Sequence, residues 1–369
     1  MGKGTIRRFF PGNNTPQGFF PFYRYIIPED AMRIFIFKGG PGSGKSTLMK
    51  EIGAQVNKRG FPVEYHHCSS DPPSVDAVAF PTIGVALIDG TKPHIIDPQY
   101  PGCVDEIIDL GVYWRQRGLI DSRGAIIACT REVSRTFARA YQYLKAAKAI
   151  YENWQQTNGY RLQWGLVYEK TRLLEEVVAD QQPKEAPGRE RHLFARAITS
   201  QGMVSHVATG VLPGIEEVYL VRGEPGTGKS YLVENLGKMA LARGFDVEFF
   251  HHPLDPDRVE HLTIPQLSLA VVTGIQEGID GGATIKAIFD MDSCLAPADG
   301  HQRAIIEEDR ANLKLLMQRA IAHLAEAKKR HDQLEGYYLP HIDFAAMEGL
   351  GEELVEQILL YGVRRATRI

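Results

Sequence analysis

An internal repeat constrains this chain more than any other feature of its sequence. Gly39–Ser46 reads Gly-Gly-Pro-Gly-Ser-Gly-Lys-Ser, and Gly223–Ser230 reads Gly-Glu-Pro-Gly-Thr-Gly-Lys-Ser, 184 positions later (223 − 39 = 184). Further identities continue at the same spacing over about 70 positions, which indicates a duplicated domain. They include Arg59, Gly60, Phe61, Val63, Glu64, His67, Asp71, Pro72 and Pro81, which recur as Arg243, Gly244, Phe245, Val247, Glu248, His251, Asp255, Pro256 and Pro265.

Each glycine-rich segment lies between a predicted strand and a predicted helix. The apolar runs Ile34–Phe37 and Val218–Val221 precede the segments, and helical patterns begin at Ser46 and Ser230. This order is typical of a P-loop, whose backbone N–H groups hold phosphate oxygens, while the lysine contacts the phosphates and the serine binds Mg²⁺. The predicted nucleotide-binding residues are Gly39, Gly40, Pro41, Gly42, Ser43, Gly44, Lys45, Ser46 and Thr47, and in the second copy Gly223, Glu224, Pro225, Gly226, Thr227, Gly228, Lys229, Ser230 and Tyr231.

A carboxylate at the end of a second buried strand should complete each magnesium site. Val85–Asp89 has this form in the first copy, so Asp89 is the expected acid, although an aspartate before Gly90 also fits a turn. The second copy has Thr273 at the matching position. Its acid would come from elsewhere, with Asp255, Asp280 and Asp290 as candidates; otherwise the second copy binds nucleotide without hydrolysing it.

Two further aspartates are candidate catalytic groups. Asp71 and Asp255 are predicted to end the strand that follows each P-loop helix, at the edge of a parallel sheet where ligands bind. Either could orient a water or accept a proton, but Asp-Pro also begins turns. His67 and His251 lie just before them, and we expect site or turn roles rather than zinc binding, because no cluster of further metal ligands is evident.

Phosphoryl transfer often uses an arginine to neutralise charge in the transition state. Downstream of the strands the two copies match at a spacing of 180 rather than 184, and Arg123 and Arg303 form one such pair just before a predicted helix. Arg139 and Arg319 form another pair inside the helices, where charged side chains are usually exposed. Arg123 and Arg303 are therefore the better catalytic candidates.

Both copies also predict a helical hairpin. Apolar residues recur at spacings of four and three, which places them on one stripe of a helix. A second helical run follows at Gln163–Ala179 and, in the other copy, near Phe344–Leu360. The stripe would belong to a core, to a seam against the other copy, or to a surface that binds another protein. Its members are Val133, Phe137, Ala140, Leu144 and Ala147, matched by Leu313, Met317, Ala320, Leu324 and Ala327.

The segment Gln181–Gly188 is polar, contains two prolines and has no apolar period, so it predicts the linker between the copies. We expect an α/β protein with two tandem P-loop NTPase domains, residues 1–183 and 184–369, related by an approximate two-fold axis. Each domain would have a parallel sheet sandwiched by helices and a projecting helical hairpin.

Composition limits the class of protein. The four cysteines are widely spaced and the formal net charge is −3, which favours a reducing compartment and gives no clear nucleic-acid signal. The N-terminal segment has no apolar run typical of a secretion signal, and no apolar stretch reaches the length of a membrane span. We therefore expect a cytoplasmic protein.

The absence of an Asn-Lys-x-Asp element favours ATP over GTP, and the absence of an LSGGQ-like run argues against a transporter ATPase. The paired P-loops, the Arg-Gly-Phe-x-Val-Glu segments and Asp89–His94 resemble a family of bacterial tandem P-loop NTPases. That resemblance covers the whole chain and implies nucleotide binding, without a substrate.

The leading functional prediction is Mg²⁺-dependent ATP binding and hydrolysis. Lys45 and Lys229 would hold the phosphates, and nucleotide would promote association of the two copies. One alternative is a kinase that transfers the γ-phosphoryl group to a small acceptor, with Asp71 or Asp255 as base. Another is a non-catalytic switch in which bound nucleotide sets the hairpins for a protein partner.

Overall fold

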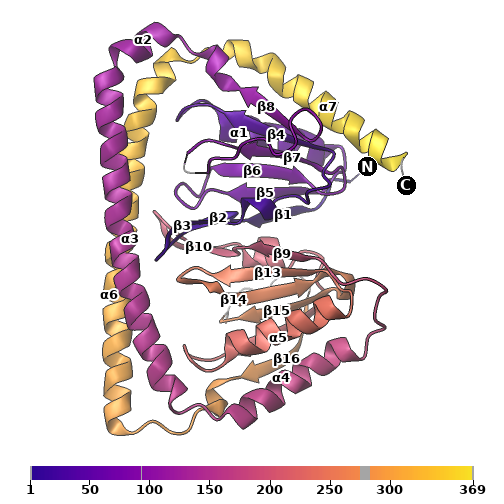
Figure 1. Ribbon diagram of the computed structural model, residues 1–369, viewed down its shortest axis with the longest axis vertical. Coiled ribbons are helices and arrows are strands. Elements are labelled where there is room, and N and C mark those ends of the chain that lie inside the picture. The colour runs from indigo at the N-terminus through magenta and orange to yellow at the C-terminus, as the bar shows by residue number, and fades with distance from the viewer. Residues whose placement is uncertain (1, 93, 275–282, 368–369) are drawn as a thin grey trace.

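Two mixed six-stranded sheets, one in each half of the chain, form the framework of this α/β protein (Figure 1). The computed structural model describes residues 2–92, 94–274 and 283–367. The first sheet runs in the order β1 (Ile6–Phe9), β5 (Val63–His67), β6 (Val75–Phe80), β7 (Val85–Asp89), β4 (Arg33–Lys38) and β8 (Asp105–Asp109). The second has the same order: β9 (Glu190–Leu193), β13 (Val247–His252), β14 (Asp255–Ile264), β15 (Leu269–Thr273), β12 (Glu217–Arg222) and β16 (Thr284–Asp290).

The prediction of a parallel sheet is wrong at one strand of each half. β6 is antiparallel to β5 and β7, and β14 is antiparallel to β13 and β15, whereas the other neighbouring strands are parallel. The connections explain this arrangement: only residues 81–84 join β6 to β7, and only residues 253–254 join β13 to β14. A parallel crossover needs a dozen or more residues, so such short connections produce antiparallel pairs.

Helices cover one face of each sheet rather than both. The first sheet packs on this face against α1 (Lys45–Lys58) and α7 (Glu348–Ala366), and the second against α5 (Lys229–Ala242) and α4 (Trp164–Ala179). The opposite faces are covered by short irregular segments around η1 (Tyr23–Tyr25) and η3 (Val207–Val211). Small buried residues such as Ala77, Ala79 and Ala86 let the first segment lie close to the strands, so the predicted two-sided helical sandwich is not formed.

The long helices exchange partners between the halves. α3 (Arg123–Gly159) leaves the first half and ends at the second, where α4 joins the core around α5. α6 (Gly300–Tyr338) runs the opposite way, and α7 joins the core around α1 (Figure 1). The predicted boundary at 183/184 separates the two repeats in sequence, but each compact unit in space contains the last helix of the other repeat.

The apolar stripes of α3 and α6 pack against each other along a seam. Ala140, Leu144 and Ala147 are fully buried there, as are Ala320 and, with 1% exposure, Leu324. The prediction of a seam against the other copy is therefore confirmed, and these side chains form no exposed surface for a protein partner. The predicted hairpin is corrected: each long helix pairs with the long helix of the other repeat rather than folding back on the helix that follows it.

Equivalent residues of the two repeats meet where the sheet edges approach each other. Phe10 N donates to Phe194 O at 2.9 Å, and Phe194 N donates to Phe10 O at 3.1 Å. Small hairpins of β2 (Gly12–Thr15) with β3 (Gly18–Pro21), and of β10 (Arg196–Thr199) with β11 (Gly202–Ser205), lie beside this contact. The reciprocal bonds are what a pseudo-two-fold axis through the contact requires.

Two buried carboxylates and two partly buried guanidinium groups surround the same contact. Arg7 and Arg191, which are equivalent in the repeats, lie among the carboxylates of Glu64 and Glu248. Arg191 is 2.6 Å from Glu64 and 3.1 Å from Glu248, while Arg7 is 3.4 Å and 2.5 Å from the same groups. Burial alone would raise the pKa of each carboxyl, but the two guanidinium groups hold both pKa values below the usual range. The two halves are thus joined by a compact, electrically neutral network.

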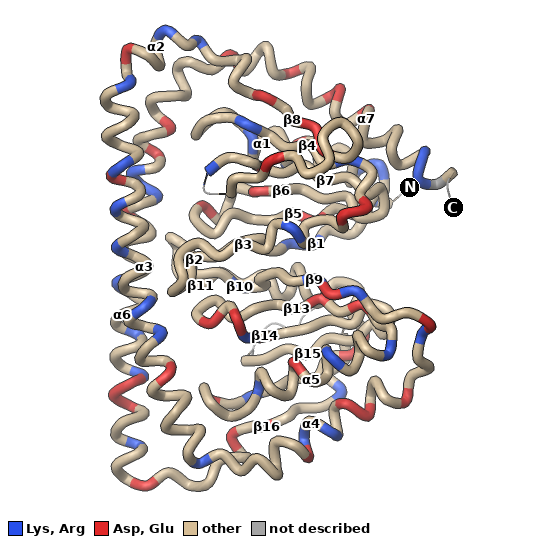
Figure 2. Tube along the Cα trace, in the orientation of Figure 1, with Lys and Arg blue, Asp and Glu red and all other residues tan. Residues whose placement is uncertain are grey.

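The surface carries charges of both signs. Acidic and basic positions are interspersed along α6, whereas most charged positions of α3 are basic (Figure 2). Within the described part of the chain, no helix is both long and apolar enough to cross a membrane.

Candidate functional site

Two glycine-rich loops, loop I (Gly39–Ser46) and loop II (Gly223–Ser230), connect β4 to α1 and β12 to α5. The predicted order of strand, loop and helix is confirmed in both halves. Gly42 and Gly44 have φ angles of 69° and 80°, and Gly226 and Gly228 have φ angles of 82° and 87°. Residues with a Cβ rarely adopt such angles, so both loops depend on glycine at these positions. Successive amides in turns of this kind can point at an anion.

The two loop lysines adopt the same conformation. Each Nζ donates to the carbonyl oxygens of the first two loop residues, at 3.0 and 2.9 Å for Lys45 and at 2.6 Å to both for Lys229. Both ammonium groups are therefore held across their own loop. Burial lowers the pKa of Lys229 to about 8, although the nearby charges of Asp292, Glu260 and Glu224 act in the opposite direction.

The loop lysine of the first half forms an ion pair with the predicted acid, and no such pair of Lys229 occurs among the described residues. Asp89 Oδ2 lies 3.6 Å from Lys45 Nζ, and Asp89 Oδ1 accepts bonds from the N–H and hydroxyl of Thr91. Asp89 therefore has both features considered from sequence, proximity to the loop and a turn-forming contact. Thr273 is buried at the corresponding position, where its N–H donates to His261 Nδ1.

Loop II adjoins acidic residues of another strand. Asp290, one of the predicted substitutes for an acid at Thr273, ends β16 beside β12. With Asp292 it borders a cavity of about 410 Å³ at the start of loop II, whose lining residues are Arg222, Gly223, Glu224, Gly274, Ile288, Asp290 and Asp292. Asp280, another predicted substitute, lies outside the described residues. Asp290 thus borders loop II from the end of β16, whereas Asp89 of the first half ends β7.

Asp109 is the equivalent of Asp290 and was not among the predicted site residues. It ends β8 beside Lys38, the last residue of β4, as Asp290 ends β16 beside Arg222. Each of these aspartates accepts the backbone N–H of the residue two positions later, at 2.7 Å for Asp109 and 3.0 Å for Asp290. The signal was present in the sequence, because both follow short apolar runs, but the changed repeat spacing concealed the match.

The loop serines make equivalent contacts with the next sheet strand. Ser46 Oγ accepts the N–H of Val75 at 2.9 Å, and Ser230 Oγ donates to the carbonyl oxygen of Val259 at 2.9 Å. Both hydroxyl groups retain a lone pair for a cation. Magnesium prefers hydroxyl, carboxylate and water oxygens, so Ser46 with Asp89 is a suitable donor set and Ser230 a partial one.

The residues after the serines have different environments. Thr47 is exposed on α1. Tyr231 packs on α4, with its ring centroid 5.4 Å from that of Trp164 and 5.8 Å from that of Tyr168. The contacts of Tyr231 are therefore with the exchanged helix.

Asp71 and Asp255 form ion pairs with the long helices. Asp71 lies 3.5 Å from Lys328 of α6, and Asp255 lies 2.7 Å from Lys148 of α3. The two lysines are equivalent in the repeats, so the contact is made twice. Asp71 is in the connection after β5 and Asp255 begins β14, which differs from the predicted placement at a strand end.

The neighbouring histidines hold the same turns. His67 Nδ1 is 2.8 Å from the carbonyl oxygen of Pro72, and His251 Nδ1 is 2.6 Å from that of Pro256. Burial lowers the pKa of both imidazoles, to about 3 for His251, so both are neutral at pH 7. The turn role considered for these histidines accounts for the Nδ1 contacts, and His251 Nε2 lies in addition 2.8 Å from His192 Nδ1.

Arg123 and Arg303 are exposed in the first turns of α3 and α6. Within the described residues, no hydrogen bond or ion pair links either arginine to loop I or loop II. Arg310, seven positions after Arg303, is the arginine that contacts a loop, at 2.7 Å from Glu224.

Each loop is packed against the end of a helix that begins in the other half. A Cβ added to Gly40 would lie 3.0 Å from Tyr338, at the end of α6, and 3.1 Å from Trp114. A Cβ at Gly42 would lie 3.3 Å from Leu339. Loop I therefore fits closely beneath the end of α6, and glycine is needed there for space as well as for conformation.

Loop II is bonded to the end of α3 in the same way. Trp154 Nε1 donates to a carboxylate oxygen of Glu224 at 3.2 Å, and Asn158 Nδ2 donates to the carbonyl oxygen of Pro225 at 2.8 Å. A Cβ at Gly226 would collide with the backbone of α3 at Gln155, 2.3 Å away. These contacts were not predicted, because the sequence does not show which half receives each helix end.

A scan of protein-family models finds no match to this chain, and searches of curated proteins and of solved structures find none either. The site must therefore be interpreted from its own geometry.

Proposed function

We propose that each half binds the phosphates of ATP with Mg²⁺, and that the first half hydrolyses ATP. The observation that carries the proposal is the identical arrangement of loop I and loop II. Both follow a buried strand, both have two glycines with positive φ, and both hold a lysine ammonium across the loop. A glycine-dependent loop conformation that is kept in both halves is expected where the loop amides bind an anion.

Lys45 and Lys229 would contact the phosphates, and Ser46 with Asp89 would hold Mg²⁺ in the first half. When bound, the ion supplies charge neutralisation at the phosphates. Asp89 is suited to the metal because it adjoins Lys45, from which its Oδ2 is 3.6 Å away. Ser230 would bind the metal at loop II, where Asp290 and Asp292 border the cavity. The missing Asn-Lys-x-Asp element favours ATP over GTP.

A nucleotide-dependent switch is the second candidate, and the contacts of the long helices favour it. Tyr338 at the end of α6 covers loop I, and Trp154 near the end of α3 is bonded to loop II. A nucleotide that moved either loop would act on the α3–α6 seam, so both sites could set one conformation. Such coupling is compatible with hydrolysis and also with binding alone.

The kinase alternative has less support. Its proposed bases, Asp71 and Asp255, are paired with Lys328 and Lys148. Each lysine therefore occupies the carboxylate that would have to accept the proton of an acceptor hydroxyl. We therefore expect phosphate release from ATP without an added acceptor.

The test is phosphate release from ATP by the full chain and by Lys45→Ala, Lys229→Ala and the double variant. Lys58→Ala, an exposed lysine on α1, is the matched control. Removal of a charge-stabilising donor typically costs about 100-fold or more in rate. We expect such a loss for Lys45→Ala, a smaller one for Lys229→Ala and none for the control. An unchanged rate in the double variant would exclude hydrolysis at these loops.

Binding and hydrolysis are separated by Asp89→Asn, which keeps the size of the side chain. We expect this variant to retain ATP, measured by equilibrium dialysis, and to lose phosphate release. If native protein retains ATP and releases no phosphate, the switch is the correct alternative.

A further inference from the structure

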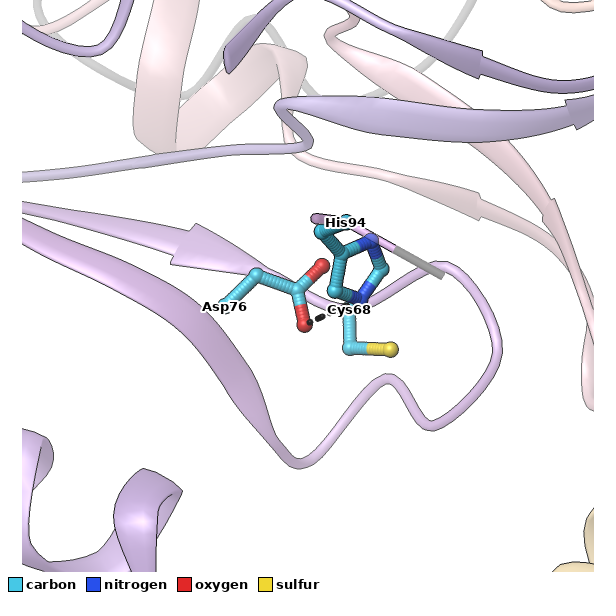
Figure 3. A group of neighbouring side chains, drawn as sticks. All are labelled: Cys68, Asp76 and His94. Atoms are coloured by element: carbon cyan, nitrogen blue, oxygen red, sulfur yellow. Dashed lines mark ion pairs between the residues drawn. The ribbon is translucent and has the colours of Figure 1, made fainter. Parts of the chain in front are cut away.

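Three potential metal ligands from separate segments meet in the first half. Cys68 follows β5, Asp76 belongs to β6, and His94 lies in the connection after β7 (Figure 3). One donor atom from each residue lies within 4.8 Å of the others. Asp76 is 4% exposed and His94 is 8% exposed, whereas Cys68 is partly exposed, so the group lies mostly within the protein. This cluster was not predicted, because its residues have no motif spacing and only the folded sheet brings them together.

Hydrogen bonds orient the imidazole as in many metal sites. The Tyr23 hydroxyl is 2.8 Å from His94 Nδ1 and 2.7 Å from Asp76 Oδ2. If Nδ1 carries the proton and donates a hydrogen bond to the Tyr23 oxygen, Nε2 is the coordinating atom. The Tyr23 hydroxyl can then donate its own hydrogen bond to Asp76. A metal-bound histidine usually donates its other ring N–H in this way. His94 Nε2 faces Asp76 Oδ1 at 3.4 Å, so a proton or a cation is needed between these two atoms.

The metal-free group satisfies this requirement with a proton. Burial would lower the pKa of His94, but the Asp76 carboxylate raises that pKa above its usual value. Burial would raise the pKa of Asp76, but His94 and Tyr23 lower it below its usual value. Burial raises the pKa of Cys68 well above its usual value, which keeps the thiol protonated.

The second half has a different arrangement at this place, in which an arginine pairs with the buried acid. Glu260 corresponds to Asp76 at the spacing of 184, and it lies 2.6 Å from Arg196. The position corresponding to Arg196 is Gly12, and Cys68 corresponds to His252. The buried acid of the second half therefore has an arginine as its counter-ion, whereas that of the first half has a titratable histidine beside a thiol.

We propose that Cys68 Sγ, a carboxylate oxygen of Asp76 and His94 Nε2 bind a divalent transition-metal ion, for which Zn²⁺ is the best fit. Sulfur, imidazole and carboxylate are the usual zinc ligands, and three of them leave a fourth position for water or another ligand. Zinc binds the thiolate and an unprotonated Nε2, so binding would release protons. The charges of the ion, the thiolate and the carboxylate then sum to zero.

The ion would join β6 to the connection that follows Asp89. Val75, which precedes Asp76, donates its N–H to Ser46 Oγ of loop I at 2.9 Å. The metal would therefore stabilise one wall of loop I. The proposal does not depend on ATP hydrolysis, and its test measures the metal directly.

The test is Co²⁺ titration of the full chain after chelator treatment and removal of the chelator, under reducing and oxygen-free conditions. We expect one tightly bound ion, visible tetrahedral d–d bands, a thiolate-to-cobalt charge-transfer band, and loss of both when Zn²⁺ is added. Cys68→Ser should lose the charge-transfer band. Cys103→Ser removes an exposed cysteine and should retain it. Asp76→Asn and His94→Gln should weaken binding at least about 10-fold, as loss of even an outer-shell partner does.

A second group of potential metal ligands could also bind cobalt, and the thiolate band distinguishes the two sites. His331, Asp332 and Glu335 of α6 also bring donor atoms within 4.8 Å of one another, but they include no thiol. Cobalt bound there would lack the charge-transfer band and would be lost in His331→Gln. A native protein without the thiolate band, or a band that survives Cys68→Ser, overturns the proposal. The titration of native protein decides this even if a variant fails to fold.

Discussion

Replacement of Arg191 by methionine tests the charge network between the halves. The guanidinium contacts Glu64 at 2.6 Å and Glu248 at 3.1 Å, and it also donates to the carbonyl oxygens of Tyr25 and Ile26. The four charges are balanced in the native protein. Without Arg191 the cluster has a net charge of −1, with both carboxylates dependent on Arg7.

The structure predicts a large loss of stability for Arg191→Met. Removal of one partner from a buried ion pair typically costs about 3–5 kcal/mol, because the remaining charge is left without compensation. Arg189→Ala is the matched control, since Arg189 pairs with Asp246 at 3.1 Å on the surface and is 75% exposed. Exposed pairs contribute about 0–1 kcal/mol. Adding Glu64→Gln to Arg191→Met restores neutrality and should recover about 1–3 kcal/mol.

Urea unfolding followed by circular dichroism measures these differences, and its pH dependence gives a second readout. Glu64 and Glu248 have folded-state pKa values below the usual 4.5. Their contribution is therefore complete above that pH and is lost as the pH falls toward the folded-state values. This acid-dependent loss should be reduced in Arg191→Met. If Arg191→Met destabilises the protein no more than Arg189→Ala, the network does not stabilise the junction.

Three further predictions concern the loops and the seam. ATP should change the fluorescence of Trp114 and Trp154, which lie against loop I and loop II. In Lys45→Ala the response of Trp114 should disappear while that of Trp154 remains. Single Trp→Phe variants assign each response to its tryptophan. In the same Lys45→Ala background, the Kd for ATP should rise by up to about tenfold per pH unit above about pH 8, because Lys229 must be protonated to bind phosphate. A Kd that does not change with pH in calorimetric titration would contradict this. Leu144→Ala should lower the free energy of unfolding by about 2–5 kcal/mol, because Leu144 is fully buried in the α3–α6 seam; a change below about 0.5 kcal/mol in urea unfolding would show that the seam is not tightly packed.

Local features of the two loops could be predicted because they depend on neighbours in sequence. The buried runs at β4 and β12, the glycines at Gly42 and Gly226, and the lysines after them specify a strand, a turn and a helix start without reference to the rest of the chain. Asp109 was missed for a different reason. Its match to Asp290 became visible only when the sheets showed both at the end of the strand beside the loop.

The sequence by itself determined that the domain is duplicated, where the loops lie, and which face of each long helix is apolar. It could not determine partners, because α4 and α7 have similar apolar faces and either could cover α1 or α5. Helix length contributed to that choice: α3 has 37 residues and α6 has 39, so at about 1.5 Å per residue each spans more than 50 Å and ends at the other half. Only the tertiary structure decided which distant residues meet. The helix exchange brings the ends of α3 and α6 to the loops, and the folded sheet brings Cys68, Asp76 and His94 together.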